Sequence, residues 1–186
     1  MKKIFGLLLS IALISNLMMG IAFASEKITS EDLRQISASE IPDGVIPMEF
    51  KTESDALAYL NEVFSISNTV KEPANALLRS TNGNATVDSE RIGVLGGTVT
   101  LKLRYGTSGN GNTGTITYTD PYTVTSGFNM GFTWTENSLG AEIMRDGKDV
   151  FCYADGVISA YINLESGATE LYEREVNLEG TVAVIR

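Results

Sequence analysis

The amino-acid sequence predicts a mainly β protein, an antiparallel β-sandwich or open barrel, preceded by a short helical N-terminal part. From residue 91 onward, apolar and polar residues alternate in most segments, which is typical of strands with one buried face. Turn-forming residues recur there roughly every 8–12 positions, so about eight or nine short strands are expected. Helical spacing of apolar residues is clear in one segment, near residues 53–64.

The first 24 residues have the organisation of an export signal. Lys2 and Lys3 precede an apolar run, Ile4–Met19, and Ala22–Ala24 follows it with the small residues that signal peptidase accepts. The alternative is a retained membrane anchor, but the run is shorter than the ~20 residues that a spanning helix needs. We therefore expect cleavage after Ala24, secretion from a bacterial cell, and no stable membrane insertion of the mature chain.

Residues 25–64 form the predicted N-terminal part. Ser30 is expected to cap a short helix from Glu31 to Ile36, with acidic residues in its first turn. A short edge strand is expected within residues 46–51, because Pro47 has no backbone N–H to donate to a neighbouring strand.

The main helix is expected near residues 53–64. Thr52 and Asp55 have the spacing of a capping box, with Asp in place of the usual Glu or Gln. The apolar stripe of this helix consists of Ala56, Leu57, Tyr59, Leu60, Val63 and Phe64. Such a stripe predicts packing against the neighbouring β domain.

Residues 65–90 are expected to be a linker, because Ser, Asn, Thr, Lys and Glu dominate them. The β domain is expected to span residues 91–186. Its first strand shows alternation most clearly, with Val99, Leu101, Leu103 and Tyr105 on one face, and Trp134 is expected in the core. Expected strands cover 98–105, 115–118, 122–125, 128–134, 141–144, 150–154, 158–164, 170–178 and 181–185, with turns at 106–114, 120–121, 137–140, 146–147 and 155–156.

Composition excludes several kinds of chemistry. The chain has no histidine and a single cysteine, which excludes histidine-based triads, histidine or thiolate zinc sites and an internal disulfide. Cys152 shares an expected strand face with Val150 and Ala154, so we interpret it as a small buried residue. Loss of Lys2 and Lys3 with the signal takes the formal net charge from −9 to −11, and such acidity disfavours nucleic acid as a partner.

The candidate ligand-binding residues are Tyr118, Asp120 and Tyr122, which surround an expected turn beside loops rich in Asn, Thr and Gly. Tyrosines with amide and hydroxyl neighbours suit stacking against sugars or contact with a protein. In the competing interpretation, Tyr118 shares a buried face with Ile116, and Tyr122 shares one with Val124. We expect a non-enzymatic extracellular binding module whose partner is a protein or a glycan, and we assign no catalytic residue and no metal ligand.

Two alternative functions stay open. A secreted hydrolase acting on glycans could use two carboxylates, and Glu173 and Glu175 are the nearest approach to a pair, although neighbouring exposed acids are normally a solvated edge. A membrane-active toxin would need alternate apolar residues over about 9–11 positions, which residues 106–127 lack. No cofactor is expected, but a calcium site assembled from separate loops stays open, since Asp146 and Asp155 each precede a glycine.

Overall fold

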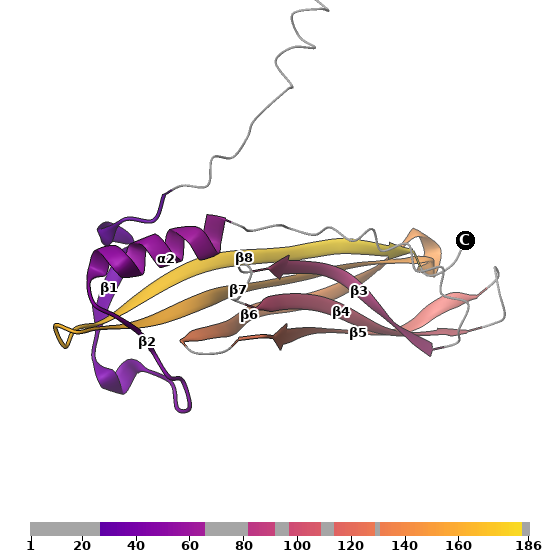
Figure 1. Cartoon of the computed structure of the whole chain (residues 1–186). Helices are drawn as coiled ribbons and strands as arrows, with labels where there is room; N and C mark the ends of the chain where they lie inside the picture. Colours follow the sequence, from indigo (N-terminus) through magenta and orange to yellow (C-terminus); the bar gives the residue numbers. More distant parts are fainter. Residues whose placement is uncertain (1–26, 66–81, 92–96, 109–113, 129–130, 184–186) are drawn as a thin grey trace, which may run out of the picture.

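The computed structural model describes residues 27–65, 82–91, 97–108, 114–128 and 131–183 (Figure 1). The predicted export signal and linker residues 66–81 lie outside the described residues. The described chain is mainly β, as predicted, with two sheets and one α-helix, α2 (Glu53–Ser65). No helix in these ranges is long and apolar enough to cross a membrane. Short 3-10 turns are η1 (Ser30–Asp32), η2 (Ala38–Glu40) and η4 (Arg145–Gly147).

The large sheet has five strands. They are β1 (Leu33–Ile36), β2 (Met48–Phe50), β6 (Phe132–Met144), β7 (Asp149–Leu164) and β8 (Thr169–Ala183). β8 pairs with β1 and β7, while β6 pairs with β7 residues 149–160 and β2 with β7 residues 162–164. β6 and β2 therefore lie end to end along one edge of β7. Among these pairings, β2 with β7 is parallel and the others are antiparallel.

The small sheet has three antiparallel strands in the order β3 (Asn82–Arg91), β4 (Thr98–Ser108) and β5 (Thr115–Ser126). The predicted alternation of β4 is confirmed, since Val99, Leu101, Leu103 and Tyr105 are all buried. These side chains point toward the large sheet. The edges of the two sheets also meet, β3 against β8 and β5 against β6.

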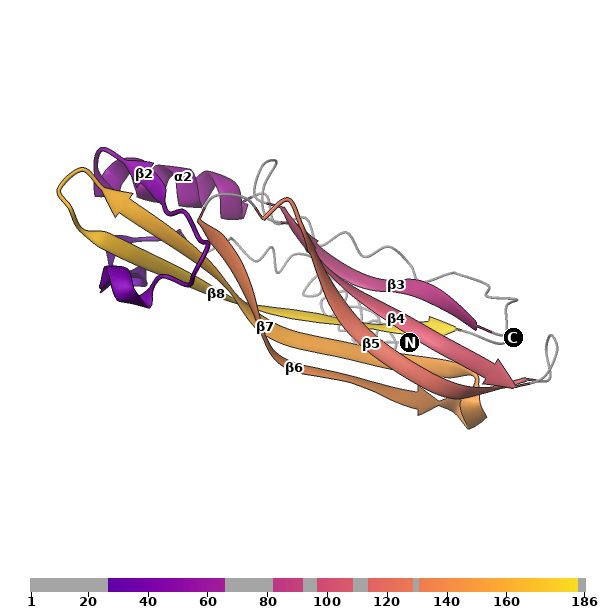
Figure 2. The same ribbon diagram turned by 90° about the horizontal axis from the view of Figure 1, so that it is seen from below.

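The helix α2 and the small sheet cover the same face of the large sheet at different ends (Figures 1 and 2). All three contribute to one apolar cluster, which includes Leu60 of α2, Leu101 of β4 and Ile158 of β7, each fully buried. The Phe64 ring of α2 packs edge-on to Tyr172 of β8 at 5.0 Å between centroids. The helix predicted near 53–64 is therefore confirmed and packs as expected, while the domain boundaries stay a prediction.

The short helix predicted from Glu31 to Ile36 is not present. The chain forms the single turn η1 and then β1, whose Leu33 and Ile36 lie opposite Tyr172 and Thr169 of β8. A helix of six residues has marginal stability in water, whereas the unpaired edge of β8 supplies hydrogen-bond partners for the backbone of this segment. Tertiary pairing therefore overrides the helical signal.

β3 spans Asn82–Arg91, and all of it except Arg91 falls in the segment predicted as a linker, residues 65–90. Ala85 and Val87 are buried, and the strand lies along β4 with a bulge between Thr86 and Asp88. Two small apolar residues among polar ones make too weak a pattern to predict a strand. The unpaired edge of β4 supplies the missing stabilisation, because its backbone groups need partners.

Three of the expected turns are absorbed into long strands. Pro121 lies within β5, where an edge strand tolerates its missing N–H. Asn137 lies at a bulge in β6, because the register with β7 shifts between Glu136 and Ser138. Gly156 lies within β7, close under the indole ring of Trp134. The turn predicted at 146–147 does occur, as part of η4 between β6 and β7.

Candidate functional site

The three candidate residues Tyr118, Asp120 and Tyr122 lie in one row along β5, on the face of the small sheet that points away from the core. Directly opposite residues in an antiparallel pair share a face, and here they are Gly106, Arg104 and Lys102 of β4 in the same order. We call this surface the outer face. The structure thus brings the three predicted residues together on a continuous strand rather than around a turn.

Tyr118 is exposed because of a bulge in β5. The register with β4 shifts between Gly106 and Thr107, so Thr117 is an extra residue and the alternation reverses there. Ile116, which precedes the bulge and is buried, is 6% exposed, whereas Tyr118, which follows the bulge, is 54% exposed. The competing interpretation, in which Tyr118 shares a buried face with Ile116, is therefore wrong.

Arg104 is the centre of the outer face. Its Nη1 lies 3.1 Å from Asp120 Oδ2, and its Cζ lies 4.4 Å from the centroid of the Tyr122 ring. An ion pair this exposed contributes only ~0–1 kcal/mol, so it does little for stability. Together with the cation–π contact it holds the guanidinium, the carboxylate and the ring in one geometry. Arg104 is not among the residues predicted from the sequence, because strand alternation indicates only that it lies opposite the buried face of Leu103 and Tyr105.

The electrostatics of Tyr118 depend on the same residues. Desolvation raises the pKa of its phenol, and the charge of Asp120 and a side-chain hydrogen bond to it add to the rise, while Arg104 opposes it. The phenol therefore stays protonated at neutral pH; its hydrogen is donated to Asp120, and its oxygen can still accept a hydrogen bond from a ligand. This suits binding of a polar ligand.

Short polar side chains surround the two rings. On β3, Asn84 and Thr86 lie opposite Arg104 and Lys102 of β4 and are exposed. Among residues whose side chains the structure describes, the further outer-face residues are Ser89, Thr98, Thr100, Val124 and Ser126. The outer face is thus a sheet surface with two tyrosines, amide and hydroxyl groups and one aliphatic side chain.

No family model, curated protein or solved structure matches the chain.

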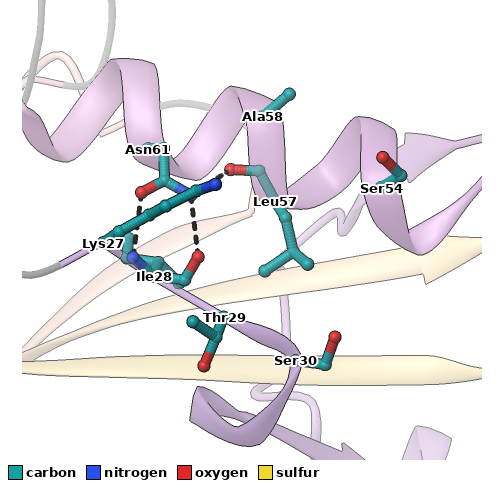
Figure 3. A pocket seen from close by; sticks show the side chains of 8 residues that line it. All are labelled: Lys27, Ile28, Thr29, Ser30, Ser54, Leu57, Ala58 and Asn61. Carbon is teal, nitrogen blue, oxygen red and sulfur yellow. Dashed lines mark hydrogen bonds between the residues drawn. The ribbon is translucent and has the colours of Figure 1, made fainter.

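A groove lies between α2 and the segment that precedes η1, with a volume of about 470 Å³ (Figure 3). It is lined by Lys27, Ile28, Thr29, Ser30, Ser54, Leu57, Ala58 and Asn61. The Asn61 amide donates to the Ile28 carbonyl at 2.9 Å and to the Leu57 carbonyl at 2.8 Å, and its oxygen accepts the Ile28 N–H at 2.9 Å. These bonds use both hydrogens of the Asn61 amide group, so Asn61 links the N-terminal segment to the helix and has no donor left for a ligand.

The predicted carboxylate pair, Glu173 and Glu175, lies exposed on β8 and points away from the core. Glu173 accepts a hydrogen bond from Ser159 at 3.4 Å. A different carboxylate is perturbed. Burial, and next the charge of Glu53, raise the pKa of Glu170, whose Oε2 is buried without a hydrogen-bond partner among the described residues.

Glu170 lies between β1 and β7 in the large sheet, opposite Gln35 and Ile162, and it does not line the groove beside α2. Its environment was not predictable, because Glu53 reaches it only through the docking of α2. In the described ranges, no three Cys, Asp or Glu residues gather in a group that could hold a metal ion. The loop-assembled calcium site stays a hypothesis.

Proposed function

We propose that this chain is an exported, non-enzymatic binding module that holds an extracellular glycan or protein on the outer face of its small sheet. The observation that carries the proposal is the cluster around Arg104, which contacts both Asp120 and Tyr122 beside Tyr118, a residue that is 54% exposed. The two sheets, taken as the halves of the predicted β-sandwich, give this cluster a rigid support. Cleavage after Ala24 would release the module from the cell.

The composition of the outer face favours a glycan over a protein. Protein interfaces bury a core that is largely apolar and rich in aromatic residues. The outer face has one aliphatic side chain, Val124, and its tyrosines are separated by Asp120. A tyrosine ring packs against the apolar face of a sugar, while amides and hydroxyls bind the sugar hydroxyls.

The test uses the mature chain, residues 25–186, labelled and applied to a panel of soluble polysaccharides and oligosaccharides. Tyr118→Ala and Tyr122→Ala are each expected to weaken binding about three- to tenfold, because each removes a stacking contact. Tyr153→Ala is the matched control, since Tyr153 is an exposed tyrosine, 38% accessible, on the other sheet. Equal loss of binding in all three variants, or in none, would contradict the assignment of the outer face.

A second candidate function, a carboxylate-dependent hydrolase acting on glycans, is favoured by one observation: Glu170 has a buried Oε2 with no hydrogen-bond partner among the described residues, and burial, followed by the charge of Glu53, raises its pKa. A general acid needs a raised pKa of this kind. The measurement is the release of reducing ends from the same polysaccharides by the wild type and by Glu170→Gln. Release that persists unchanged in the variant would show that Glu170 is not the acid.

A further inference from the structure

We propose that the ligand of the outer face is an anionic glycan, a sugar chain that carries carboxylate or sulfate groups. This inference rests on the proposed function and names its ligand class. It follows from the charge of the outer face, which differs in sign from the charge of the chain.

The outer face carries two cations and one carboxylate among the residues described above: Lys102, Arg104 and Asp120. The chain as a whole has a formal net charge of −9. Asp120 neutralises Arg104 through the 3.1 Å ion pair, whereas Lys102 has no ionic partner in the described part of the chain. The net negative charge of the chain repels a polyanion at long range, as it does nucleic acid, so attraction of an anion comes from short-range contact with the positive residues of the outer face.

The position of Lys102 ties this charge to the stacking rings. Lys102 lies directly opposite Tyr122, so its ammonium group and the ring share one face of the sheet. A sugar packed on Tyr122 would place a ring substituent within reach of the ammonium. A carboxylate or sulfate at that point gains an ionic contact that a neutral hydroxyl does not.

The spacing of the tyrosines indicates a chain rather than a single sugar. Tyr118 and Tyr122 are four residues apart on one strand, which separates them by about 13 Å. Arg104, Asp120 and Lys102 lie between or beside them. One monosaccharide cannot contact both rings, so an oligosaccharide laid along β5 makes fullest use of the surface.

The test measures the affinity of the mature chain for polygalacturonate and heparin, with neutral dextran and poly-glutamate as comparison ligands. We expect at least one acidic polysaccharide to bind at least tenfold more tightly than dextran or poly-glutamate. Lys102→Gln should weaken that binding about three- to fivefold, as expected for one exposed ionic contact, and reduce its dependence on salt. Lys51→Gln, which removes an exposed lysine beside β2, is the matched control and should leave the affinity unchanged.

The outcomes separate the inference from the proposed function. If dextran binds equally well, or if Lys102→Gln has no effect, the ligand is not an anionic glycan. If Tyr118→Ala still weakens binding in that case, the outer face remains the binding surface. If poly-glutamate binds equally well, the protein recognises charge without a sugar, and the proposal that its ligand is a glycan is overturned. Failure of both acidic polysaccharides to bind overturns the inference. Binding that neither tyrosine variant weakens overturns the proposed function as well. Circular dichroism confirms that each variant is folded.

Discussion

The Asp88 carboxylate of β3 accepts the backbone N–H of Glu179 of β8 at 3.2 Å and so joins the two sheets at one edge. Asp88 is only 3% exposed, and it also accepts the N–H of Ser89. At the opposite edge, Thr123 of β5 donates to Glu136 of β6 at 2.7 Å and accepts from the Trp134 indole at 3.3 Å. Side chains, rather than a strand ladder, therefore bridge both edges in the part of the chain that the structure describes.

Asp88→Ala is expected to destabilise the fold by about 1–3 kcal/mol, because it leaves the Glu179 N–H without its partner at a partly buried position. Asp88→Asn should cost less, since one amide oxygen can still accept. Thr86→Ala, at an exposed position of the same strand, is the control. Chemical denaturation followed by circular dichroism measures the free energy of unfolding. An unchanged stability in Asp88→Ala would show that the bond across the edge contributes nothing.

Gly156→Ala is expected to displace the Trp134 ring, because an added Cβ would overlap both the indole and the backbone carbonyl oxygen of Thr135. Overpacking of this kind costs about 1–3 kcal/mol. Trp134 is the single tryptophan, so its emission reports directly on the displacement and should shift to the red as the ring becomes hydrated.

The control for this variant is Gly167→Ala. Gly167 has a positive φ of 87° and open space around its Cα, so alanine there costs ~1 kcal/mol through backbone strain alone. It should leave the tryptophan emission unchanged. A red shift in both variants would mean that emission follows general loosening rather than displacement of the ring.

Asn61→Ala is expected to release the N-terminal segment from α2, because it removes all three bonds that hold Ile28 and Leu57. The expected loss of stability is about 1–3 kcal/mol. Hydrogen exchange at the Ile28 amide should rise far more than exchange in β7. Ser54→Ala, in the same groove but exposed, should change neither. Full protection of the Ile28 amide in Asn61→Ala would contradict the proposed tether.

Cys152 is expected to resist thiol reagents while the protein is folded. The residue is fully buried, and burial raises the pKa of its thiol to about 12, so almost no thiolate exists at pH 8. Because the unfolded thiol ionises near pH 9, this group stabilises the fold below that pH, and the contribution is lost as the pH rises toward 12. Labelling by iodoacetamide should be complete in guanidinium chloride and very slow without it. Rapid labelling of the native protein would contradict this expectation.

Asp32 gives a pH prediction of the opposite sign. The backbone N–H of Thr29, and then its hydroxyl, lower the pKa of Asp32 below its ordinary value of 3.8. Asp32 therefore contributes stability above that value and loses it as the pH falls through the lowered pKa. Thr29→Val removes the hydroxyl only and should raise the pKa of Asp32 partway, as followed by carbon NMR. Glu40, which has its own cap at Ser37, is the internal reference and should not shift.

The elements predictable from the sequence are those whose signal is local. The alternation of Val99, Leu101 and Leu103 and the helical stripe of α2 each lie within one element, so no knowledge of neighbours is needed. The buried position of Cys152 also followed from a local pattern. β3 and β1 could not be predicted, because the open edges of β4 and β8 stabilise them from elsewhere in the chain.

In the candidate site, too, part of the arrangement follows from the local sequence and part from strand pairing. Tyr118, Asp120 and Tyr122 were grouped because they surround Pro121, which was expected to form a turn. They lie together for a different reason, namely that an edge strand tolerates Pro121 and a bulge turns Tyr118 outward. Arg104 joins them only because β4 and β5 pair in one register among several that the sequence permits.

The pairing of β1 with β8 has a consequence for folding. It joins the first and last strands of the described chain, and β8 also completes the sheet through β7. Contacts between distant segments form slowly, because the chain entropy lost in closing a long loop comes before the contacts that offset it. During synthesis from the N-terminus, β1 and the apolar stripe of α2 lack the sheet against which they pack until β8 has been made. The final hairpin therefore sets when the molecule can fold.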